Sequence, residues 1–72
     1  MHWHITYGAY YADGERYAYL VTKDRTGWVA LYHPSTEPRR GPYGLLPFGH
    51  VGTRRAAQRL AENFERDIRC SR

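Results

Sequence analysis

The sequence predicts an α+β fold: a three-stranded antiparallel sheet, in strand order 1-2-3, with one C-terminal helix packed on one face. Apolar residues recur with helical spacing in one long segment, about residues 53–69. The chain before residue 34 instead alternates apolar and polar residues between short turn sequences. A length of 72 residues allows a single domain, so residues 1–72 are expected to form one β-β-β-α unit.

The three strands are expected at residues 2–12, 15–23 and 28–33. Asp13-Gly14 separates the first two, and this pair is typical of a two-residue hairpin turn because both residue types tolerate a positive φ. A four-residue turn at 24–27 separates the second and third strands, and Pro34 ends the third.

The lengths of these turns predict the register of the strands and therefore the two faces of the sheet. The first turn should pair Ala12 with Glu15, and the second should pair Lys23 with Trp28. One face is then largely aliphatic and is expected to carry the helix; it holds Ile5, Tyr7, Ala9, Ala18, Leu20, Val29 and Leu31. The other face is expected to be open and largely aromatic; it holds Thr6, Gly8, Tyr10, Tyr17, Tyr19, Val21, Lys23, Trp28, Ala30 and Tyr32.

A long loop is expected over residues 34–52, which contain all four prolines and four of the seven glycines. Within this loop, Leu45, Leu46 and Phe48 should pack over the edge of the core as a short extended segment.

The helix is expected to begin at Thr53, whose hydroxyl can accept a hydrogen bond from an unpaired amide of the first turn. Its core face should hold Ala57, Leu60, Ala61, Phe64 and Ile68, and its solvent face Arg55, Gln58, Arg59, Glu62, Glu65, Arg66 and Arg69. The N-terminal half also carries Arg54, so three cations lie where the helix dipole disfavours them. A solvated surface and an anion-binding site explain these cations equally well.

The composition limits the classes of function. A net charge of +4 and a pI of about 9.6 are compatible with a polyanionic partner. The single Cys70 cannot form an internal disulfide, which favours a reducing, cytoplasmic (intracellular) compartment. No stretch approaches the ~20 apolar residues that a membrane-spanning helix needs, so no membrane partner is expected.

No residue set indicates catalysis, a cofactor or a small-molecule substrate, so the chain is not expected to be an enzyme. His2 and His4 would point to the same side of a strand, which suits a metal ion. No Cys or acidic cluster stands near them, which favours unliganded histidines and no metal site.

The order of elements, with Gly52, Thr53, Ala56 and Ala57 at the entry to the helix, resembles small three-strand-plus-helix domains of the phage-integrase arm-binding and plant ethylene-response-factor types. The chain also looks like many short proteins of phages and actinobacteria. The resemblance implies a sheet face that enters the DNA major groove and carries several Arg or Lys residues.

Two binding functions follow from the expected open face. A protein-interaction module, such as a phage-type modulator of a host protein, would bind a partner or a second copy through aromatic anchors. A nucleic-acid-binding accessory protein would stack bases on the same face and contact phosphates with a basic edge. The face residues are Tyr10, Tyr17, Tyr19, Lys23, Trp28 and Tyr32, and the edge residues are Arg39, Arg40, Arg54, Arg55 and Arg59. The protein-interaction function is favoured, since Arg16 and Lys23 are the only Arg or Lys residues in the expected strands.

Overall fold

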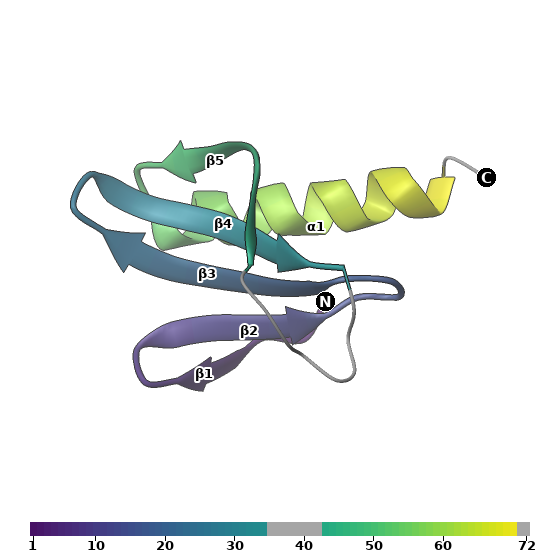
Figure 1. Cartoon of the computed structure of the whole chain (residues 1–72), viewed down its shortest axis with the longest axis horizontal. Coiled ribbons are helices and arrows are strands. Elements are labelled where there is room, and N and C mark those ends of the chain that lie inside the picture. Colours follow the sequence, from purple (N-terminus) through teal and green to yellow (C-terminus); the bar gives the residue numbers. More distant parts are fainter. Residues whose placement is uncertain (35–42, 71–72) are drawn as a thin grey trace.

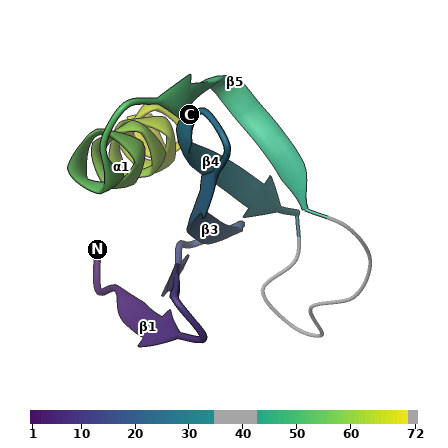
Figure 2. The same cartoon turned by 90° about the vertical axis from the view of Figure 1, so that its left-hand side faces the viewer.

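The computed structural model describes residues 1–34 and 43–70 and has an α+β fold (Figures 1 and 2). Its elements are β1 (His4–Thr6), β2 (Ala9–Asp13), β3 (Ala18–Asp24), β4 (Gly27–His33), β5 (Gly44–Val51) and α1 (Arg54–Cys70). The strands form one antiparallel sheet in the order β1-β2-β3-β4-β5, and α1 packs on one face. The predicted C-terminal helix on an antiparallel sheet is confirmed, but the sheet has five strands rather than three.

The first additional strand arises because the expected strand at residues 2–12 is a hairpin. Tyr7 and Gly8 have φ angles of 52° and 76°, the positive values that a two-residue hairpin turn requires. The chain therefore reverses at Tyr7, and Ile5 in β1 pairs with Tyr10 in β2. The prediction of one long strand was wrong because tyrosine is an unusual residue at a turn position of positive φ.

The second additional strand, β5, occupies the later part of the expected loop at 34–52. It pairs with β4, and an irregularity in the register leaves residues 46–49 without direct partners opposite Ala30. Leu46 is buried there, as expected, whereas Leu45 and Phe48 are exposed. The expectation that all three would cover the core was therefore wrong for two of them.

The register between β3 and β4 is the predicted one, with Lys23 opposite Trp28. Between β2 and β3, however, Asp13 lies opposite Ala18, so the turn contains four residues, 14–17, instead of two. A change of two residues in the turn does not exchange the faces of the next strand. The aromatic residues of β3 and β4 therefore share one face, as the sequence predicts.

Gly14 lies in this turn for a reason other than its hairpin signal. Its N–H donates to the carbonyl oxygen of Tyr17 (2.7 Å), and a Cβ on Gly14 would collide with the side chain of Glu65. The close approach of α1 to this turn therefore requires glycine.

The helix covers the aromatic face of the sheet, so the prediction that this face is open was wrong. Tyr19 has no exposed surface. The buried core comprises Tyr19, Val21, Ala30, Leu46, Ala57 and Ala61. Small alanines on the helix let it approach the large rings of the sheet.

Phe64 fixes this packing. Its ring lies among the rings of Tyr17, Tyr19 and Tyr32, with centroid distances of 5.8, 6.2 and 6.0 Å. These separations are those of favourable aromatic pairs. Five of the six residues expected to form an open binding face, all except Lys23, thus belong to the core cluster or pack against it.

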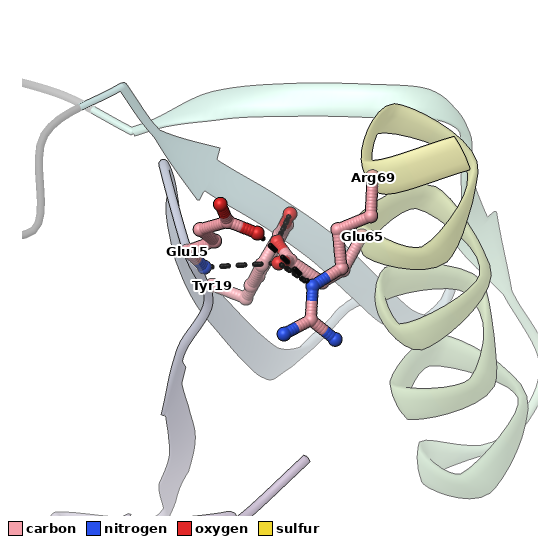
Figure 3. A network of polar contacts seen from close by, with 4 residues as sticks. All are labelled: Glu15, Tyr19, Glu65 and Arg69. Carbon is pink, nitrogen blue, oxygen red and sulfur yellow. Dashed lines mark hydrogen bonds and ion pairs between the residues drawn. The ribbon is translucent and has the colours of Figure 1, made fainter. Parts of the chain in front are cut away.

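A buried carboxylate links the C-terminal half of α1 to the sheet (Figure 3). Glu65 is 5% exposed, although the helical pattern assigned it to the solvent face. It accepts hydrogen bonds from the Tyr19 hydroxyl (2.7 Å) and the Glu15 backbone N–H (2.9 Å). Arg69 Nε lies 3.5 Å from Glu65 Oε2 and 3.2 Å from Glu15 Oε2.

Burial and the neighbouring Glu65 carboxylate raise the pKa of the Tyr19 phenol above its ordinary value. The phenol therefore stays protonated and remains a hydrogen-bond donor to Glu65 well into alkaline pH. The network accounts for the acidic residue on the core side of the helix.

Candidate functional site

The β3–β4 turn and the start of α1 lie at the same end of the domain (Figure 1), and both segments carry exposed cations. We call this surface the basic end; it comprises Lys23, Arg25, Arg54, Arg55 and Arg59. A Cβ on Gly27 would lie 2.6 Å from the carbonyl oxygen of Val51 and 3.5 Å from Cα of Gly52. The turn thus lies directly against the residues that lead into the helix.

Two aromatic rings connect the cations of the turn with those of the helix. Arg54 Nη1 donates to the Tyr10 hydroxyl (2.7 Å), and the guanidinium carbon lies 4.9 Å from the centre of that ring. The Tyr10 ring is 6.3 Å from the ring of Trp28, which pairs with Lys23 across the strands. Arg54 and Lys23 therefore lie on the same side of the sheet.

The start of α1 adds to the positive potential. The Thr53 hydroxyl accepts a hydrogen bond from the Ala56 N–H (3.1 Å), which confirms Thr53 as the residue that caps the helix. The first turn of α1 contains no acidic residue. The helix dipole and the cations Arg54 and Arg55 thus act in the same direction, at a cost to local stability.

Asp24 lies among these cations, and its carboxylate is used within its own turn. The hydrogen bond from the Thr26 backbone N–H (2.9 Å) holds the pKa of Asp24 below its usual value. The Thr26 hydroxyl also donates to it (3.0 Å), and His50 Nδ1 lies 3.5 Å away. Asp24 is thus held within its own turn, and its charged carboxylate lies beside the exposed Lys23 and Arg25.

The opposite end of the domain has a different charge. A cleft of about 730 Å³ lies there between the chain start, the β2–β3 turn and the second half of α1. Its lining includes Asp13, Glu15, Glu62 and Glu65 together with Arg66 and Arg69. Cations and carboxylates are thus mixed at this end, whereas cations dominate at the basic end.

The structure divides the predicted site residues among three environments. Tyr10 and Trp28 support the basic end, and Lys23 belongs to it. Tyr17, Tyr19 and Tyr32 lie under the helix. Arg54, Arg55 and Arg59 are exposed, as the basic-edge hypothesis requires, whereas Arg39 and Arg40 lie outside the described residues.

Arg25 was not among the site residues predicted from the sequence, because its place beside the helix start depends on β5. In an antiparallel sheet whose last strand pairs with β4 and leads into a helix, the β3–β4 turn must lie beside the start of that helix. Because β5 was expected to be a loop, this position of Arg25 could not be deduced.

The rings of His2 and His4 contact each other edge to face, with centroids 4.9 Å apart. Across residues 1–34 and 43–70, no three or more His, Cys, Asp or Glu side chains come together in a way that would hold a metal ion. In the same two stretches, α1 is too polar to cross a bilayer, and no other helix is present.

Comparison with known proteins gives no match to a family model, a curated protein or a solved structure.

Proposed function

We propose that this domain is a non-enzymatic nucleic-acid-binding module that contacts phosphates through its basic end. The observation that carries the proposal is the exposure of five cations from two segments on one end of the molecule. Phosphate contacts by Lys and Arg supply most of the sequence-independent affinity for nucleic acids. The placement of Arg54 and Arg55 against the helix dipole also supports an anionic ligand, because such a ligand would offset their mutual repulsion.

One cation of the basic end is already held in place before a ligand binds. Arg54 is held by the hydroxyl and the ring of Tyr10, so this cation loses little conformational freedom when it binds a phosphate. The guanidinium of Arg54 also presents a planar set of donors suited to phosphate oxygens.

The test is the affinity of the wild-type protein for a labelled mixed-sequence oligonucleotide, measured by fluorescence anisotropy over a salt series. With up to five phosphate contacts on a single strand, the affinity is expected to fall by roughly 20- to 100-fold between 50 and 200 mM salt. Binding that ignores salt, or no binding at low salt, would remove the basis of this function.

A protein-interaction module is the second candidate, on a surface other than the one the sequence indicated. On the face opposite α1, Tyr11, Leu20 and Leu31 lie side by side across the strands and are half-buried. Leu45 continues this row on β5 and is exposed. A salt-insensitive dimer or complex would favour this apolar row over the basic end.

A further inference from the structure

Two aromatic residues have an unusual backbone conformation and are almost fully exposed. Tyr7 has a φ of 52° and is 102% exposed relative to a reference residue; Phe48 has a φ of 58° and is 91% exposed. Within residues 1–34 and 43–70, they are the two residues other than glycine with a positive φ. Glycine or asparagine is the usual residue at such positions, because a bulky side chain there strains the backbone.

Each residue opposes local stability in two ways. The positive φ strains the backbone, and the ring lies in water rather than in the core. Neither ring contributes to the core cluster or to the aromatic packing around Phe64. Backbone strain of this kind is found mainly at functional sites, so the two rings point to a binding site for a ligand.

Both rings lie close along the chain to the basic end. Tyr7 precedes Tyr10, the partner of Arg54, by three residues, which span at most ~11 Å. Phe48 precedes His50, which contacts Asp24 in the β3–β4 turn, by two residues, or at most ~7 Å. Figure 1 shows the β1–β2 turn at the same end of the domain as the β3–β4 turn and the start of α1.

We propose that the ligand is a single-stranded nucleic acid, with the rings of Tyr7 and Phe48 stacked on unpaired bases while the basic end holds the phosphates. The inference deepens the proposed function and rests on it. Exposed rings beside a cationic surface are the combination that binds single strands without sequence preference. In a duplex the base faces are already stacked on each other, so the same rings would gain nothing from it.

Substitutions that relieve the strain and remove the ring provide the test. Tyr7→Asn and Phe48→Gly each replace an exposed ring with a residue suited to a positive φ. Each variant is expected to keep or raise the melting temperature and to bind a mixed-sequence single strand about 5- to 100-fold more weakly. The salt dependence should be unchanged, because no cation is removed. Tyr7→Phe and Phe48→Tyr, which keep a ring, should bind like the wild type.

The outcomes separate this inference from the proposed function. If the wild type shows salt-dependent binding but both ring-free variants bind single strands equally well, the stacking inference is wrong and the basic end remains the site. A duplex bound as tightly as the single strand would also overturn it. If the wild type binds neither strand nor duplex, the proposed function fails as well.

Discussion

Glu65→Ala is expected to lower the free energy of unfolding by about 3–5 kcal/mol, a large part of what a domain of this size possesses. The substitution leaves the buried Tyr19 hydroxyl and the Glu15 N–H without their acceptor and opens a cavity at the contact between helix and sheet. The measurement is urea unfolding followed by circular dichroism. Glu65→Gln keeps the volume and one acceptor, so it should cost less and remain measurable if the alanine variant is unfolded.

The matched control is Glu62→Ala, one turn earlier on the same helix. Glu62 is exposed and accepts a hydrogen bond from the Trp3 indole N–H (2.9 Å). Exposed contacts of this kind contribute little, so the control should cost about 1 kcal/mol or less. Equal losses in the two alanine variants would show that the buried network is not what holds α1 to the sheet.

Removal of two cations from the basic end should weaken nucleic-acid binding, whereas removal of two from the opposite end should not. Arg55→Gln/Arg59→Gln is expected to reduce the affinity on the order of tenfold at low salt. It should also reduce the dependence of log affinity on log salt by about 1.4, because two single-strand phosphate contacts are lost. Anisotropy titrations over a salt series give both quantities.

The control for this experiment is Arg16→Gln/Arg66→Gln, which removes the same net charge from exposed positions in the β2–β3 turn and the second half of α1. It should bind like the wild type. The basic-end variant should also be no less stable, because relief of cation repulsion at the helix start favours α1 by a few tenths of a kcal/mol. An equal loss of affinity in both variants would mean that net charge, rather than the basic end, governs binding.

The elements predicted correctly from the sequence are those whose residue types suit their local backbone conformation. The helix start at Thr53 and the pairing of Lys23 with Trp28 follow from capping and turn chemistry, and both are present. The turn itself is shorter than predicted, because Asp24 and Gly27 also pair and leave two residues between the strands instead of four. The apolar face of the helix was also recognised, since Ala57 and Ala61 are buried.

The errors occurred where a residue goes against its local preference. Tyr7 at a hairpin turn has a positive φ that no propensity would assign to an aromatic residue, and it obscured β1. β5 was missed because Gly44, Pro47 and Gly49 within it are residues that disfavour a strand. Glu65 was assigned to solvent because a carboxylate on a helix is usually exposed. Its burial depends on the Tyr19 hydroxyl, a tertiary contact that no local pattern contains.

The residues of the sheet alone do not determine which of its two faces the helix covers. Both faces carry apolar residues, and in the structure Ala57 and Ala61 of the helix pack in one cluster with the Tyr19 ring. Because the helix packs on the aromatic face, the residues expected to form an open binding face lie in or against the core. Of the predicted basic edge, Arg54, Arg55 and Arg59 are exposed, and Arg54 also contacts Tyr10 of the sheet.

The most direct test of the basic end is a map of amide chemical shifts in the ¹⁵N-labelled protein during titration with a mixed-sequence single-stranded oligonucleotide. The largest changes are expected at residues 23–27 and 53–59, with further changes next to Tyr7 and Phe48, and they should reverse as salt is added. Changes centred on Tyr11, Leu20 and Leu31, or on the cleft near Glu15, would contradict binding through the basic end.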